Sequence, residues 1–233
     1  MAYRWVATSV AGFVQQLAVG YISNSYYFYV TGVVPEQKDP ANTDRKILEG
    51  YGISVSKWIR ARRKKERKAN VQYLRYGRFY VIIATHGFHE FFEAEADSLH
   101  DVRKRPILFR GYSIGCRRGR GGGAYHASVR INRELYQEIK AGFEKVAVNW
   151  SVPRLCRELL LLPFEPYAPV RTQYRCLLRA INRRRAVAGL DPVPPEALRL
   201  HRAPVRPFDA DPAGDLSELE VQFPPRPPKE SIE

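Results

Sequence analysis

The sequence predicts an α+β protein: a small antiparallel sheet with helices on one face, followed by a helical C-terminal part. Two observations support this class. Paired runs rich in aromatic and β-branched residues, separated by glycine, are typical of β-hairpins. Around them lie stretches whose apolar residues recur every three or four positions, as on one face of a helix. The elements follow the order helix, strand, two helices, two hairpins and three helices, which favours a sheet covered by helices.

The first helix is predicted by an apolar stripe at helical spacing, formed by Val10, Phe13, Val14 and Leu17. It lies in a mostly apolar stretch from Trp5 to Ile22, which the polar pair Gln15 and Gln16 interrupts. A membrane-spanning helix needs about 20 apolar residues without such a break, and a signal peptide needs a small-residue cleavage site. We therefore expect a helix of a soluble protein here, and no membrane partner.

The elements that follow are marked by composition and by turn residues. The aromatic and β-branched run over 26–34 predicts a strand, which proline at position 35 ends. Two helices are expected over 45–51 and 55–69, with a turn at 40–44 before the first of them. Two hairpins are expected next, over 71–76 with 79–85 and over 107–116 with 124–131.

Three helices complete the predicted body. The first, over 132–148, carries an apolar stripe made of Leu135, Ile139, Phe143 and Val146. The second, over 151–162, begins with a serine that can cap it and a proline in its first turn. The third, over 169–188, ends at Gly189, a residue suited to the left-handed conformation that follows many helices.

Charge and cysteine content narrow the class of partner and the compartment. The chain of 233 residues has 38 Lys and Arg against 24 Asp and Glu, a net charge of +14 and a pI of about 9.9. Such an excess favours nucleic acid or another anionic partner. Hydrophobic residues make up 45%, which excludes a fully disordered chain. Cys116, Cys156 and Cys176 form neither a disulfide framework nor a zinc pattern, so we expect a reduced, cytoplasmic protein.

Residues 209–233 differ in composition from the rest of the chain. They hold seven acids, two bases and five prolines, a net charge of −5 (2 − 7). We expect a flexible acidic, proline-rich tail, either a nucleic-acid mimic that covers the basic surface or a plain solubilising segment. Residues 1–208 then carry +19 (14 + 5) and are expected to form a single nucleic-acid-binding domain, helical from about residue 132.

The densest basic cluster lies on the helix expected over 55–69. It holds a single acid, Glu66, and seven cations: Arg60, Arg62, Arg63, Lys64, Lys65, Arg67 and Lys68. One acid cannot neutralise so many like charges by i,i+4 pairing. A phosphate backbone is therefore the expected partner of this helix, and the alternative is a solvated helix face.

Two further basic elements are candidates for nucleic-acid contact. The glycine-rich loop over 117–123 carries Arg117, Arg118 and Arg120, whose side chains could hold phosphates or stack on bases. The alternative is a flexible hairpin loop. The last predicted helix carries a ridge at spacings of four, which is typical of a helix lying along a phosphate backbone, made of Arg171, Arg175, Arg179 and Arg183.

The first hairpin combines aromatic residues with one more cation. Arg78 lies at its turn and is a further candidate for nucleic-acid contact. The aromatic residues of the hairpin, which could stack on unpaired bases, are Tyr73, Tyr76, Phe79 and Tyr80. The alternative is that they pack in the core across the two strands.

A cluster of imidazoles and carboxylates after the first hairpin is the candidate metal site. His86, His89 and Glu93 are spaced three and four apart, and such ligands suit Mg²⁺ or Mn²⁺. The alternative is an amphipathic acidic segment in which Phe88, Phe91 and Phe92 form the buried part. No cofactor is certain, and a divalent metal is expected only if the protein is a nuclease.

The run Tyr27–Gly32, followed by helices and then by Tyr73–Ile83, resembles the single-strand tyrosine transposases of the IS200 and REP-associated type. The resemblance covers residues 26–85. It implies a ferredoxin-like fold that handles nucleic acid, with two metal-binding histidines on a strand in the pattern His-hydrophobic-His. It also implies a tyrosine nucleophile on a later helix.

The sequence departs from the family at the metal site. The histidine pattern falls on Arg78-Phe79-Tyr80, which is degenerate, and a second possible match at 125–128 keeps only His126. The candidate nucleophile is Tyr174, because it lies on the basic last helix. The catalytic candidates are therefore His126 and Tyr174.

The expected function is binding of single-stranded or structured DNA or RNA by the basic helices and the Gly-Arg loop. The alternatives are a metal-dependent nuclease or tyrosine strand-transferase of a mobile genetic element, and a structural subunit of a ribonucleoprotein with a protein partner. The residues leave open whether the protein is an enzyme.

Overall fold

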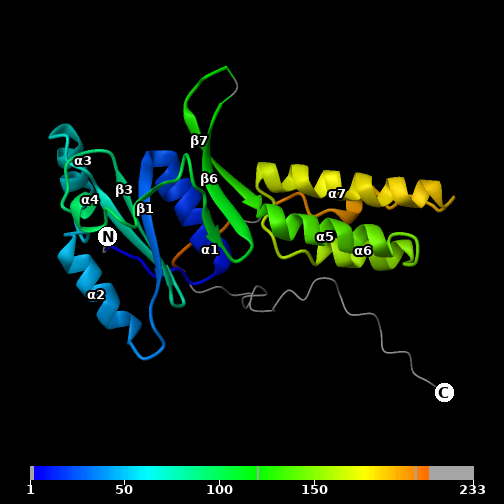
Figure 1. The fold of residues 1–233 in the computed structure, drawn as a ribbon, viewed down its shortest axis with the longest axis horizontal. Coiled ribbons are helices and arrows are strands. Elements are labelled where there is room, and N and C mark those ends of the chain that lie inside the picture. The colour runs from blue at the N-terminus through cyan, green and yellow to red at the C-terminus, as the bar shows by residue number, and fades with distance from the viewer. Residues whose placement is uncertain (1–2, 120, 203, 210–233) are drawn as a thin grey trace. The chain divides into compact units, whose positions relative to one another are not determined.

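The computed structural model describes residues 3–119, 121–202 and 204–209, which form two compact units (Figure 1). Of these residues, the first unit contains 3–110, 114–119, 121–128 and 204–209, and the second contains 111–113 and 129–202. The sequence showed no such division, because no linker rich in proline or glycine separates the units. The chain instead changes unit inside strands, between 113 and 114 and between 128 and 129.

The first unit is built on a four-stranded antiparallel sheet with the order β2-β3-β1-β4. Its strands are β1 (Tyr26–Val33), β2 (Val71–Tyr76), β3 (Phe79–Thr85) and β4 (His100–Asp101). Helices α2 (Pro40–Gly50) and α3 (Lys57–Lys65) connect β1 to β2, and α4 (Phe91–Ala94) connects β3 to β4. This split βαβ arrangement is the ferredoxin-like topology, and the predicted α+β class is confirmed.

Helix α2 begins earlier than the sequence predicted. The stretch 40–44 was expected to be a turn, but it forms the first turns of the helix. The Asp39 side chain caps it by accepting a hydrogen bond from the Ala41 amide at 3.0 Å. Pro40 at the first helical position costs nothing, because its missing N–H would have no partner there.

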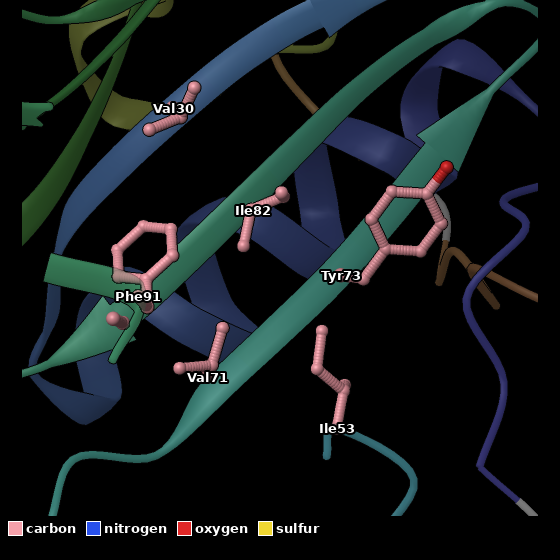
Figure 2. Close-up of a cluster of buried hydrophobic side chains, with 7 residues drawn as sticks. Val30, Ile53, Val71, Tyr73, Ile82 and Phe91 are labelled. Atoms are coloured by element: carbon pink, nitrogen blue, oxygen red, sulfur yellow. The ribbon is translucent and has the colours of Figure 1, made fainter. Parts of the chain in front are cut away.

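The face of the sheet toward α2 and α4 carries a cluster of buried side chains. Figure 2 shows Val30, Val71, Tyr73 and Ile82 from the strands, with Ile53 and Phe91 from the connections. Successive side chains of a strand alternate between faces. Residues 71–74 of β2 and 81–84 of β3 are all buried, so both faces of these strands are covered.

The opposite face is covered by the N-terminal helix. Helix α1 (Val10–Gln15) continues into a π-helical segment (Gln16–Tyr21) and a short 3-10 turn (Ile22–Asn24). It passes behind the strands in Figure 2, and the rings of Phe13 and Phe79 lie 5.8 Å apart.

The predicted second hairpin is a three-stranded sheet of β5 (Ile107–Phe109), β6 (Tyr112–Arg118) and β7 (Tyr125–Ile131), in that order. The run 107–116 was expected to be one strand. Arg110 and Gly111 break it, because both have positive φ, 43° and 77°. At Gly111 an added Cβ would lie 2.6 Å from the Leu135 side chain, so only glycine fits this turn.

The second unit contains the three predicted helices α5 (Arg133–Val146), α6 (Val152–Leu160) and α7 (Ala168–Val187), followed by a 3-10 turn (Pro195–Ala197). The Asn132 side chain caps α5 by accepting from the Glu134 amide at 2.8 Å. The guanidinium of Arg185, only 4% exposed, donates to the carbonyls of Ala147 and Trp150 after α5. In the part of the chain described, no helix has the length and apolar content that crossing a membrane requires.

Candidate nucleic-acid interface

The first unit has a hollow of about 620 Å³ where β1 begins, β3 ends and α3 passes by. We call it the first hollow. Its lining includes Tyr27 and Phe28 of β1, His86 after β3, and the cations Arg60, Lys64 and Arg103. Its volume is in the range of pockets that hold small ligands. A basic and aromatic lining of this kind suits a phosphate next to a base.

A cluster of stacked aromatic and guanidinium groups lies at Arg103. The Arg103 guanidinium carbon is 4.7 Å from the ring centre of Tyr27 and 5.6 Å from those of Phe28 and Tyr125. The Arg118 guanidinium carbon lies 5.2 Å from the ring centre of Tyr125. We call these five residues the stacking cluster. A guanidinium cation and the face of an aromatic ring attract each other, and this attraction stabilises the cluster.

Asp101 fixes the orientation of Arg103. The Arg103 Nε lies 2.9 Å from Oδ1 of Asp101, and Nη2 lies 2.7 Å from Oδ2. The bidentate geometry holds the guanidinium plane still. The hydrogen bonds to Asp101 are the main reason that the pKa of Arg103 is raised, so it remains a cation under all physiological conditions.

A second hollow of about 720 Å³ lies beside the first in the same unit. The two hollows share Gly20, Tyr26 and Arg60 in their linings. Arg4, Lys57 and Trp58 line only the second. Among the described residues no Asp or Glu lines either hollow, whereas five cations do: Arg4, Lys57, Arg60, Lys64 and Arg103.

Helix α3 brings the predicted basic cluster to these hollows. None of its residues is buried, so it contributes almost nothing to the core. Four cations lie in its last turn, where the negative end of the helix dipole favours positive charge. Asn70 donates to the carbonyl of Arg60 at 3.0 Å and ties the helix to the residue before β2.

The structure separates the cations of this cluster by their surroundings. Arg60 and Lys64 line the hollows, and Lys64 makes no ion pair within the described residues. Arg62 and Lys68 both pair with Glu66, at 3.1 and 3.0 Å. The others are Arg63, half-buried against the carbonyl of Gly52, and the exposed Lys65 and Arg67. The sequence could not distinguish these roles, because they depend on which side of α3 faces the sheet.

Comparison of the chain with models of known protein families, with curated proteins and with solved structures found no match. The functional argument therefore rests on the residues and their geometry.

The Gly-Arg loop is only partly covered by the structure. Arg117 and Arg118 are exposed at the end of β6, and Arg118 belongs to the stacking cluster. Arg120 lies outside the described residues. The part of the loop that can be seen thus places one arginine next to the first unit's aromatic residues.

The basic ridge of α7 is in the second unit. Arg175, Arg179 and Arg183 are exposed along the helix, as the spacing predicted. Arg171 is half-buried and donates to the carbonyl of Pro166 at 3.2 Å, so it has a structural partner at the start of the helix. Three residues of the ridge thus present their charge to solvent.

The contacts of Arg78 are with the backbone of its own unit and do not support its predicted role in nucleic-acid binding. Its Nη1 donates to the carbonyls of Val34, Pro35 and Lys38, and its Nη2 donates to that of Glu36 at 3.0 Å. The guanidinium thereby closes the loop between β1 and α2. All of these contacts satisfy backbone oxygens that a loop leaves without partners.

The aromatic residues of the first hairpin pack within the unit. Tyr73 is fully buried, and its hydroxyl donates to Asp44 at 2.6 Å. The rings of Tyr76 and Phe79 lie 6.0 and 5.1 Å from that of Phe109. These three residues therefore pack within the unit, which is the alternative that the sequence analysis gave for this hairpin. Tyr27 and Tyr125, which the sequence did not predict as stacking residues, are half-buried beside Arg103.

The structure does not assemble the predicted metal site. Among the described residues no three His, Cys, Asp or Glu side chains are placed to hold one ion. His86 lines the first hollow and contacts Phe28, with their ring centres 6.3 Å apart. His89 accepts a hydrogen bond from the Phe91 amide through Nδ1 at 3.1 Å, and burial, followed by the charge of Arg63, lowers its pKa. Glu93 is exposed on the short helix α4.

The catalytic candidates are also in surroundings that do not support their predicted roles. Tyr174 is 1% exposed, and its hydroxyl donates to the carbonyl of Phe164 at 2.9 Å. Burial raises its pKa, which opposes formation of a phenolate nucleophile. His126 is exposed on β7. The basic helix α7 also has an apolar side, and position 174 falls on it.

The sequence missed Arg103, Asp101 and Tyr125. Arg103 and Tyr125 are both far from Tyr27 in the chain, and the pairing of β4 with β1 brings Arg103 next to Tyr27. A local signal existed in Asp-x-Arg at 101–103, a spacing at which one side chain can reach the other in a turn.

Proposed function

We propose that this chain binds nucleic acid, and that the two adjoining hollows of the first unit contact it. The observation that carries the proposal is their lining: five cations, several aromatic rings and, among the described residues, no carboxylate. Two of the five cations, Arg4 and Arg103, pair with Asp209 and Asp101, which lie outside the lining. Lys and Arg neutralise phosphates and release counterions, while aromatic rings stack on bases. Another small anion would explain the cations but not the aromatic rings beside them.

The lining favours unpaired bases over a regular duplex. Bases in a duplex are already stacked on each other, so aromatic side chains can reach them only in loops, bulges and single strands. Tyr27, Phe28 and Tyr125 lie beside cations that would hold the flanking phosphates. The proposed ligand is therefore single-stranded or structured DNA or RNA.

The topology supports the proposal at the level of the fold only. The strand order of the first sheet is ferredoxin-like, as the resemblance to single-strand tyrosine transposases implies. This fold hosts many unrelated functions, so it does not argue for transposition. The described residues offer no specific observation in favour of strand cleavage.

The test removes two cations that line the hollows and leaves the core untouched. Lys57→Ala combined with Lys64→Ala is compared with Lys46→Ala combined with Lys145→Ala, whose lysines are exposed on helices and line neither hollow. The slope of log K against log salt is negative, and with a single-stranded oligonucleotide each lost phosphate contact should reduce its magnitude by about 0.7. We expect a decrease of about 1.4 for the first pair and no change for the second.

Equal slopes for the two double variants and the parent would contradict the proposal, because the hollows would then contribute no phosphate contact. To determine whether the ligand is DNA or RNA, the parent protein is purified without nuclease. Any retained nucleic acid is treated with RNase or with DNase, and the enzyme that releases it identifies the class.

A further inference from the structure

The second hollow has polar side chains on its inner surface that phosphate binding does not need. Gln16, Tyr21, Tyr26 and Gln72 all line it. Gln72 is 4% exposed and Tyr21 is 5% exposed. Buried carboxamide and hydroxyl groups cost free energy unless they have partners. Their concentration in a basic hollow offers hydrogen-bonding groups to a ligand that has donors and acceptors of its own.

The hydrogen bonds within the structure satisfy only part of this set. The Gln72 Nε2 donates to the carbonyl of Val71, its neighbour in the chain, at 3.0 Å. Gln16 interacts with the hydroxyl of Tyr21, and Gln72 with that of Tyr26. A carboxamide offers two N–H donors and two acceptor positions. These contacts leave each of the two carboxamides with hydrogen-bonding capacity.

The π-helical segment sets the position of Gln16. Such segments are rare and often occur at functional sites. Gly20 leaves room for this side chain, because a Cβ at that position would lie 2.6 Å from Nε2 of Gln16 and 2.9 Å from its Oε1 and would displace the carboxamide. The Gln16 carboxamide thus lies directly over a residue that has no side chain.

The rim of the hollow carries a large exposed ring and cations. Trp58 is 75% exposed although it is the largest apolar side chain of α3, and Lys57 lies 5.2 Å from its ring centre. Arg4 and Arg60 also line the hollow. Burial raises the pKa of Tyr21 to about 12, so its hydroxyl stays protonated and can donate at neutral pH.

We propose that the second hollow binds a single unstacked nucleobase, whose edge is read by the carboxamides of Gln16 and Gln72. The inference rests on the proposed function and adds the part of the ligand that this site selects. Carboxamides make paired hydrogen bonds to base edges, and a base out of its stack is recognised by such bonds together with aromatic contact. Trp58 is placed to stack on the base, and Lys57 and Arg60 to hold its phosphate.

The same chemistry occurs in a base of a bound strand and in a free nucleotide. The experiment therefore measures binding of the four homopolymeric single-stranded oligonucleotides and, separately, of the four nucleoside monophosphates. A strand ligand gives base preference with the oligonucleotides at much higher affinity than with the monophosphates. A free nucleotide as ligand reverses that order.

The decisive variants are Gln16→Ala and Gly20→Ala. The first removes the carboxamide, and the second leaves every polar atom present while its methyl group displaces the carboxamide of Gln16. Gly50→Ala is the matched control, because a Cβ at Gly50 meets nothing within 4 Å. Thermal unfolding of the three variants is measured as the control for folding.

We expect the parent to prefer one base over the poorest by at least about fivefold, the lower end of what a paired hydrogen bond to a base edge contributes. Both Gln16→Ala and Gly20→Ala should reduce this ratio toward one without changing the salt slope, and Gly50→Ala should keep it. A parent without preference, or a preference that both variants retain, overturns the inference. If the parent binds no oligonucleotide at all, the proposed function is wrong. The base site is then tested separately by the base-selective binding of the monophosphates.

Discussion

Asp44 lies where four hydrogen-bond donors meet in the first unit. Its Oδ1 accepts from the Tyr73 hydroxyl at 2.6 Å and from the Arg75 Nε at 2.8 Å. Its Oδ2 accepts from the indole of Trp5 at 2.9 Å and from the Arg75 Nη2 at 2.8 Å. The carboxylate thus joins α2 to β2 and to the N-terminal segment. A buried charge with every lone pair occupied is stable, but losing that charge leaves the arginine uncompensated.

Replacing Asp44 by Asn should therefore destabilise the protein by about 3–5 kcal/mol, because Arg75 would remain buried without its counter-charge. Urea unfolding at pH 7 measures the change. The control is Asp97→Asn, at an exposed turn position, which should stay within about 0.5 kcal/mol of the parent. Similar values for the two variants would mean that the network does not stabilise the fold.

The same residue predicts a dependence of stability on pH. Burial alone would raise the pKa of Asp44, but the hydrogen bonds from Arg75, Tyr73 and Trp5 outweigh it and lower the pKa below its ordinary value of 3.8. Its contribution is therefore complete above that ordinary value and is lost as the pH falls through the lowered one. The difference in unfolding free energy between the parent and Asp44→Asn should be constant from pH 7 to 5 and shrink below pH 4. A difference that stays constant to pH 3 contradicts this account.

Helix α3 and helix α7 show how differently two basic helices can be placed. Helix α3 has no buried residue, while α7 buries Val170, Tyr174, Leu177 and Ile181 along one side. The exposed arginines of α7 therefore lie on a firmly packed helix. Helix α3 has mainly hydrogen bonds such as that from Asn70 to the Arg60 carbonyl to position it.

The ridge of α7 is tested by Arg175→Glu combined with Arg179→Glu, which leaves the structural Arg171 intact. If the ridge contacts phosphates, affinity should fall by about 1 kcal/mol or more per contact at low salt, for every sequence bound. The matched control is Arg133→Glu combined with Lys145→Glu, at exposed positions of α5 in the same unit. Binding equal to that of the control would show that the ridge is a solvated face.

Elements with strong local signals were predictable from the sequence. The apolar stripes of α5 to α7 and the Gly77 hairpin depend on neighbours within a few residues. Ser151 precedes α6 as predicted, but its side chain makes no capping hydrogen bond. Helix α3 ended sooner than expected, at Lys65, because Arg67 adopts a positive φ of 57°. The two-residue strand β4 and the π-helical segment were missed, since both depend on contacts with distant residues.

The candidate site was predictable only in its charge. The excess of Lys and Arg around 60–68 is a property of the sequence, whereas the hollows form from segments that the sheet brings together. Arg103 joins Tyr27 through strand pairing, and Tyr125 joins them from the second sheet. A buried tyrosine such as Tyr174 cannot be told from an accessible one by its neighbours in the sequence.

At the scale of the whole molecule, the chain returns to its N-terminal segment after the second unit. The Thr8 amide donates to the carbonyl of Pro207 at 3.1 Å, and Arg4 pairs with Asp209 at 3.0 Å. Gly12 is needed for this contact, because an added Cβ would lie 2.9 Å from the Cα of Pro207. The segment 204–209 is thus part of the first unit.

Two truncations separate this segment from the acidic region that follows. The predicted acidic, proline-rich tail lies, from residue 210 on, outside the described residues. A chain ending at Asp209 should keep the parent's thermal midpoint, because the removed residues have little apolar content to bury. A chain ending at Arg202 should unfold at a lower temperature, since it loses the contacts of Thr8 and Arg4. A large loss in the longer chain would show that the acidic region packs.

The affinity of the longer truncation distinguishes the two interpretations of the acidic region. A nucleic-acid mimic would compete for the basic surface, so its removal should strengthen binding. Unchanged affinity would identify a solubilising segment.

The central claim, that the basic hollows hold a phosphate backbone, is tested most directly by the salt dependence of binding. Affinity of the parent for a single-stranded and a duplex oligonucleotide is measured between 50 and 300 mM salt. If about six phosphates are neutralised, the slope of log K against log salt should be near −4 for the single strand and near −5 for the duplex. An affinity that barely changes over this range would contradict the claim, because phosphate contacts by Lys and Arg cannot be insensitive to salt.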